Sequence, residues 1–190
     1  EIVSEAGQKN ESALQYHFNS LQGLIDTLHL RRSEQTQSKR AELLEELIAT
    51  GNEISLRDVC RLMVLPSFLL ARKSADHRRY ILSFSHETAL RSDSLHTIYK
   101  AGGGGQSGKQ TQELLRENLP HLDDEAFTDR MESAIRLTSI SIGHHARQKN
   151  AFRGETSDLF LSNLVDTLVG LLGAPVSDET LKLRESQTKR

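Results

Sequence analysis

The sequence predicts an all-α fold, and three observations support this prediction. Hydrophobic residues make up 36% of the 190 residues, leucine is the commonest of them, and the chain has only three prolines and no tryptophan. The frequent residues Leu, Glu, Gln, Arg and Ala are good helix formers. Apolar residues recur at the three- and four-residue spacing of a helix, and no stretch shows the alternation of a strand.

The N-terminal elements are expected to be short helices. Residues 2–6 are typical of the end of a helix, which stops at Gly7, and residues 8–10 form a polar turn. Asn10 is a favourable N-cap for a short helix over residues 12–18. We therefore expect two helices joined by a tight turn at the start of the chain.

A longer amphipathic pattern follows. Asn19-Ser20 is expected to start a helix with one apolar face, made by Leu21, Leu24, Ile25 and Leu28. Residues 31–40 are polar all round, which predicts a solvated helix or a loop. Apolar spacing resumes at Leu43 and ends at residues 50–52.

The middle of the chain carries three further helical patterns. Ser55 is expected to cap a helix that Pro66 kinks or ends. A helix over residues 77–99 follows, with a candidate break at residues 92–94. The four consecutive glycines at 102–105 predict a mobile loop, and a short helix is expected over about 109–118.

The last two helices suggest a dimer. A long helix opens at Asp123 with an acidic first turn, as the helix dipole favours. The last helix, over about 157–172, is apolar on more than one face and must bury both faces. We expect these two helices to form a four-helix interface with a second copy; the alternative is that the last helix is the central helix of a monomeric bundle. The predicted interface residues are Phe127, Met131, Ile135, Ile142, Phe160, Leu164, Leu168 and Leu171.

Overall composition excludes several classes of protein. The net charge of −2 does not indicate nucleic acid, so a DNA-binding role must rest on pattern. The single cysteine, Cys60, cannot form an internal disulfide and suits a reducing cytoplasm. No apolar run reaches the roughly 20 residues of a membrane helix, and we expect no signal peptide. Because the chain begins at Glu1 rather than Met, we expect an upstream segment to precede it.

The start of the chain has the form of a helix-turn-helix, whose second helix reads the major groove. The sequence around this motif resembles the TetR (tetracycline-repressor-like) family of transcriptional regulators. The resemblance rests on Glu5-Ala6-Gly7, on His17-Phe18 and on Asn19-Ser20-Leu21-Gln22-Gly23-Leu24. Later stretches fit the same family, namely Glu42-Leu43-Leu44, Ser55-Leu56-Arg57-Asp58, Leu65-Pro66, Asn163-Leu164-Val165-Asp166 and Ala174-Pro175.

The resemblance implies a DNA-reading head, N-terminally truncated here, on a helical-bundle body that binds a ligand and dimerises. Phe18 would tie the head to the next helix, and Lys9 would contact a phosphate. Leu21 stands where many members carry Lys or Arg, so that phosphate contact is expected to be absent. The implied DNA-binding residues are Gln8, Lys9, Asn10, Ser12, Ala13, Gln15, Tyr16 and His17.

Candidate pocket residues lie on the two helices of the middle section. A ligand is expected between the helix that follows Ser55 and the helix over residues 77–99. The candidate lining residues are Met63, Phe68, Tyr80, Phe84, His86 and His96. The alternative for the histidines is a satisfied core or surface position. Cys60 and Met63 are predicted core residues, with a ligand-lining role as the alternative.

Other motifs give no support for catalysis. Gly103 to Lys109 partly matches a phosphate-binding loop, but Gln110 stands where Ser or Thr would hold Mg²⁺. His144 and His145 are adjacent and cannot chelate one metal well on a helix. No nucleophile–base spacing is present. We expect no enzyme activity, no metal and no cofactor.

The predicted function is therefore sequence-specific DNA binding, most simply repression, controlled by a small-molecule effector. Residues 1–30 would be the remnant head and linking helix, and residues 31–190 the ligand-binding and dimerisation domain. The expected partners are a palindromic double-stranded operator, the effector and a second copy, with no membrane and a cytoplasmic, nucleoid-associated location. The alternatives are a helical ligand-binding or adaptor protein with a vestigial head and, third, a nucleotide-binding enzyme.

Overall fold

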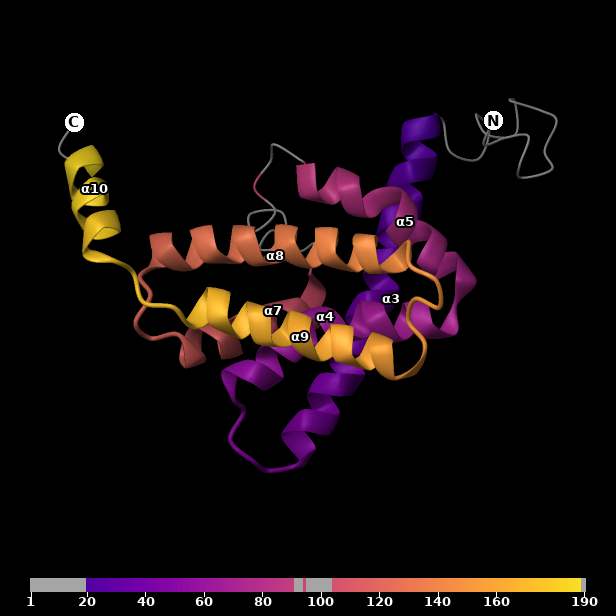
Figure 1. The fold of residues 1–190 in the computed structure, drawn as a ribbon, viewed down its shortest axis with the longest axis horizontal. Helices are drawn as coiled ribbons and strands as arrows, with labels where there is room; N and C mark the ends of the chain where they lie inside the picture. Colours follow the sequence, from indigo (N-terminus) through magenta and orange to yellow (C-terminus); the bar gives the residue numbers. More distant parts are fainter. Residues whose placement is uncertain (1–19, 91–93, 95–103, 189–190) are drawn as a thin grey trace.

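The computed structural model describes residues 20–90, 94 and 104–188, and the described elements are all helices (Figure 1). This confirms the all-α fold class. The helices are α3 (Leu21–Ala49), α4 (Leu56–Lys73), α5 (Ala75–Leu90), α7 (Gly105–Asn118), α8 (Asp124–Ala146), α9 (Gly154–Gly173) and α10 (Asp178–Thr188).

Helix α3 is continuous for 29 residues. It begins at Ser20, whose hydroxyl accepts a hydrogen bond from the backbone N–H of Gly23 at 3.0 Å. It passes without a break through residues 31–40, so this segment is helix and not loop, and also through the domain boundary predicted at residue 30. Arg40 and Leu44 are buried where α3 packs on α4 and α7.

Helix α4 begins with a capping box. Ser55 and Asp58 each bind the other's backbone N–H, as the sequence predicts for a cap at Ser55. The helix continues through Pro66 to Lys73, so the proline does not end it. Val64, Pro66 and Phe68 are all buried, and this packing offsets the hydrogen bond that the proline removes.

Helices α8 and α9 lie side by side along one face of the molecule (Figure 1). In addition, α8 packs on α5 and α9 packs on α4. Asp123 caps α8 by accepting from the N–H of Ala126 at 2.7 Å, and Asp124 and Glu125 occupy its first turn as predicted. The buried residues of these helices form one hydrophobic core with α4 and α7.

Helix α10 was not expected, because α9 was predicted to be the last helix. It extends away from the body at the C-terminal end (Figure 1), and Leu181 and Leu183 are exposed on it. Arg184 anchors it by ion pairs to Asp123, Glu125 and Asp129 of the α8 region, the shortest at 2.8 Å. With only two leucines in eleven residues, α10 has too weak an apolar pattern to stand out in the sequence.

No single helix in the described part of the chain is long and apolar enough to cross a membrane. Helices α9 and α10 together pass the same length and composition test, but they are bent by 57° at the break between them.

Candidate ligand-binding site

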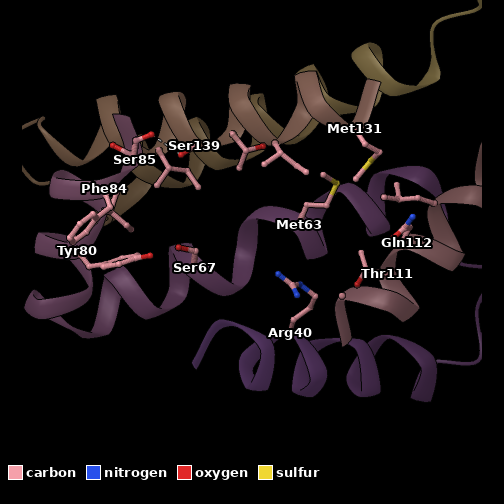
Figure 2. A pocket seen from close by; sticks show the side chains of 16 residues that line it. Arg40, Met63, Ser67, Tyr80, Phe84, Ser85, Thr111, Gln112, Met131 and Ser139 are labelled. Carbon is pink, nitrogen blue, oxygen red and sulfur yellow. Dashed lines mark hydrogen bonds between the residues drawn. The ribbon is translucent and has the colours of Figure 1, made fainter. Parts of the chain in front are cut away.

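A cavity of about 220 Å³ lies inside the body, among helices α3, α4, α5, α7 and α8 (Figure 2). Half of its lining residues are apolar: Met63, Tyr80, Ile81, Phe84, Leu115, Met131, Ile135 and Ile142. Uncharged polar or small residues make up most of the rest: Ser67, Ser85, Gly108, Thr111, Gln112, Thr138 and Ser139. An apolar wall with a few placed polar groups is the usual form of a small-molecule site.

Arg40 is the one charged residue among the described residues that line this cavity. It reaches from α3 toward Met63 and Thr111 (Figure 2), and only 4% of its surface is exposed. Its Nη1 donates to the carbonyl of Gly104 at 3.4 Å, at the start of α7. A guanidinium keeps its positive charge even when buried, so this part of the wall is cationic.

Gly105 allows α7 to begin close to α3. Its φ of +59° lies in the left-handed region, and a Cβ there would come 2.5 Å from the side-chain carbon Cδ of Gln37. Ser107, in the first turn of α7, donates from its hydroxyl to the carbonyl of Gln37 at 2.9 Å. The cavity wall at Arg40 is therefore held by contacts between α3 and α7.

A second, more polar cavity of about 190 Å³ adjoins the first and shares Arg40, Ser67 and Tyr80 with it. Its other lining residues are His29, Arg32, Ser33, Thr36, Gln37 and His77. The α3 residues among these lie at positions 29, 32, 33, 36, 37 and 40, which is one face of a helix. The stretch that looked polar all round in the sequence thus turns one polar face inward.

Two imidazoles hold the hydroxyls shared by the cavities. His29 Nδ1 lies 2.8 Å from the Tyr80 hydroxyl, and His77 Nε2 lies 3.2 Å from the Ser67 hydroxyl. The opposite ring nitrogens, His29 Nε2 and His77 Nδ1, are buried and have no hydrogen-bond partner among the described residues, and the same holds for Arg32 Nε. These polar atoms point to a site that a polar ligand group or water fills.

Burial controls the ionisation of this cluster. It lowers the pKa of His77 to about 4, with a further lowering from the charge of Arg32. Burial also raises the pKa of Tyr80. At neutral pH both side chains are therefore uncharged, and the charge of the shared wall comes from Arg40.

The predicted pocket residues divide into three groups. Met63, Tyr80 and Phe84 line the cavity. Phe68 does not, because it turns toward the segment between α8 and α9, where the ring centres of Phe68 and Phe152 lie 5.2 Å apart. His86 does not either, because it is exposed on the outer side of α5, and His96 lies outside the described residues.

Most of the predicted interface residues are buried within the single chain. Phe127, Met131, Ile142, Leu164 and Leu168 are all buried in the single chain. Of the remaining three, Ile135 lines the cavity, Phe160 stacks on His145 with ring centres 4.0 Å apart, and Leu171 is half-buried. The buried members of this set therefore belong to the chain's own hydrophobic core, and Ile135, Phe160 and Leu171 pack against it.

Sequence reasoning missed several cavity residues. Arg40, Thr111 and Gln112 were not predicted, nor were Ser85 and Ser139, which face each other across α5 and α8 (Figure 2). The polar residues between positions 29 and 40 recur at helical spacing, and this pattern could have indicated a shared helix face. The pattern does not say whether that face is buried. Cys60 is in the core as predicted, and Met63 takes the lining role that was the alternative.

The predicted DNA-binding residues, Gln8, Lys9, Asn10, Ser12, Ala13, Gln15, Tyr16 and His17, lie outside the described residues. The partial phosphate-loop motif is described only from Gly104 onward, where Gly105 to Lys109 belong to α7. His144 is exposed, while His145 is buried and lies 2.8 Å from the Ser157 hydroxyl.

Comparisons of the chain with protein-family models, curated proteins and solved structures found no match.

Proposed function

We propose that the chain is a ligand-responsive, DNA-binding transcriptional regulator that acts as a dimer in the cytoplasm, at the nucleoid. One observation carries the proposal: α3 starts directly after the helix-turn-helix-like segment and lines both internal cavities farther along its length. A ligand in the cavities would therefore touch the helix that supports the proposed DNA-reading segment.

The proposed mechanism needs two states of α3 that differ in ligand affinity, because a ligand shifts an equilibrium only by its differential affinity. Arg40 and His29 would transmit the effect of a bound ligand to the rest of α3. Both residues are on α3, and at the cavities His29 contacts Tyr80 and Arg40 contacts Gly104. The bound ligand would change the position of the DNA-reading segments and so the affinity for the operator.

A palindromic operator requires a two-fold dimer, and we propose that the outer faces of α8 and α9 form it. A row of five exposed residues along α9 is uncharged, namely Thr156, Leu159, Asn163, Thr167 and Gly170, whereas the exposed Asp158 and Asp166 beside it pair with Arg72 and Arg57 of α4. Ile140 of α8 is also exposed, beside Ser133 and His144. The uncharged row on α9 is typical of the core of a subunit interface.

The test is a fluorescence anisotropy titration of the full-length protein against palindromic fragments from its own promoter region. We expect binding that weakens with added salt, because phosphate contacts release counterions. Lys9→Ala should weaken binding to all fragments, while Lys149→Ala, in the turn between α8 and α9, should leave it unchanged. A full-length protein that shifts no such fragment at low salt would contradict the proposal.

The second candidate is a helical ligand-binding or adaptor protein with a vestigial head. Two features of the sequence favour it. Residues 1–52 hold eight acidic residues against five Lys and Arg, and Leu21 stands where many family members carry a phosphate-binding cation. Ligand binding without any binding of DNA in the same titration would support this alternative.

A further inference from the structure

We infer that the two adjoining cavities bind an amphipathic acid, with its carboxylate beside Arg40, Ser67 and Tyr80 and its apolar body between Met63, Phe84 and Met131. The inference deepens the proposed function, because it names the ligand class of the same site. It rests on three features of the described residues: the sign of charge, the hydrogen-bond donors and the shape of the apolar wall.

The charge of the walls favours an anion. Arg40 lines both cavities and Arg32 lines the second, whereas none of the described lining residues of either cavity is Asp or Glu. His77 stays neutral because burial lowers its pKa to about 4. Among the described residues that line these two cavities a cationic ligand would meet only like charge, whereas a carboxylate would meet opposite charge.

The donors at the junction of the cavities match a carboxylate. A guanidinium presents a planar fork of N–H groups, which suits the two oxygens of a carboxylate. The Ser67 hydroxyl can donate its proton to a ligand when His77 Nε2 carries the ring proton and donates to Ser67. The Tyr80 hydroxyl can do the same when His29 Nδ1 carries the ring proton. In these tautomers the opposite ring nitrogens, His77 Nδ1 and His29 Nε2, are acceptors and cannot bind a carboxylate, so the donors to it are Arg40, Ser67 and Tyr80.

The larger cavity provides space for an apolar body. Met63 and Met131 line one end of it, and Tyr80 and Phe84 line the other end (Figure 2). Thioether side chains are flexible and adapt to an apolar guest. Because the polar junction lies at the α3 side, an acid would bind with its head toward α3 and its tail toward α8.

The experiment is a calorimetric titration of the full-length protein, without DNA, with straight-chain carboxylates from hexanoate to dodecanoate and with the matching alcohols. We expect at least one carboxylate to bind roughly tenfold or more tightly than its alcohol, because a hydrogen bond to a charged group is worth more than a neutral one. Arg40→Gln should remove this preference. The matched control Arg61→Gln, at an exposed position of α4, should retain it.

A second variant keeps the test valid if Arg40→Gln does not fold, which thermal unfolding followed by circular dichroism will show. Tyr80→Phe removes one hydroxyl and keeps the ring, so it should weaken the carboxylate several-fold and leave the alcohol unchanged. An alcohol that binds as tightly as its acid overturns the inference. So does a panel in which no carboxylate binds.

The outcome also separates the inference from the proposed function. Acids that bind while no promoter fragment does would support the inference and contradict the regulator. DNA binding without any binding of acids would support the regulator and overturn the inference.

Discussion

His77 is buried in a position where protonation opposes folding. The folded state holds the neutral imidazole beside Ser67, and the pKa of His77 is lowered from 6.5 to about 4. Between these values the unfolded chain binds more protons than the folded one, so stability rises with pH. The contribution is complete above pH 6.5 and is lost as the pH falls toward 4.

We therefore expect the free energy of unfolding to fall over this window, with a contribution from His77 of about 3 kcal/mol. His77→Gln, which stays neutral, should show a smaller fall in urea unfolding measured from pH 7 to pH 4. His121→Gln, at an exposed position, is the control and should keep the wild-type slope. Equal slopes for His77→Gln and the wild type would refute the assignment.

Gly143 marks a close contact between α5 and α8. A Cβ at this position would lie 2.5 Å from Cβ of Ser85, and closer still to its hydroxyl oxygen. We expect Gly143→Ala to destabilise the protein by roughly 1–3 kcal/mol, because neither helix can move without disturbing the core.

Ser85→Gly supplies the partner for a double-mutant cycle. The change costs about 1 kcal/mol on its own through helix propensity, but it removes the atoms that the new methyl group meets. In thermal unfolding the double variant should be more stable than the sum of the two single effects. Strict additivity would show that the two helices do not approach as described.

The cap of α4 shows why this element was predictable from local sequence. Ser55 and Asp58 are three residues apart and satisfy each other's backbone N–H groups, so the start of α4 is encoded by two residues. Ser55→Ala should lower the free energy of unfolding by about 1 kcal/mol. Ser38→Ala, at an exposed interior position of α3, should change it by less than about 0.5 kcal/mol. Chemical denaturation measures both, and equal effects would argue against the cap.

Other elements depended on information that local patterns do not contain. Helix positions and the fold class followed from caps and apolar spacing, as at Ser55 and Asp123. The sequence did not predict which way an apolar stripe faces. Leu164 and Leu168 would show the same spacing in a subunit interface and in a core. Arg40 was missed for the same reason, since its burial depends on α4 and α7, which are distant in sequence.

At the scale of the whole molecule, the outer face of α8 and α9 should determine the oligomeric state. Leu159 is 61% exposed and Ile140 is 49% exposed in the single chain, so neither stabilises the fold of one subunit. Leu159→Glu and Ile140→Glu should therefore give folded monomers in light scattering over a concentration series. Ile48→Glu, which changes a residue 56% exposed at the end of α3, should leave the dimer intact. A wild-type protein that remains monomeric at high concentration would rule out this interface.

The uninterrupted length of α3 has a mechanical consequence. With a rise of about 1.5 Å per residue, its first turn lies roughly 28 Å from Arg40. A tilt of about 6° around Arg40 would displace that first turn by about 3 Å. A break at residues 31–40 would absorb such a tilt, whereas a continuous helix transmits it, so a displacement of Arg40 would be felt at the far end of α3.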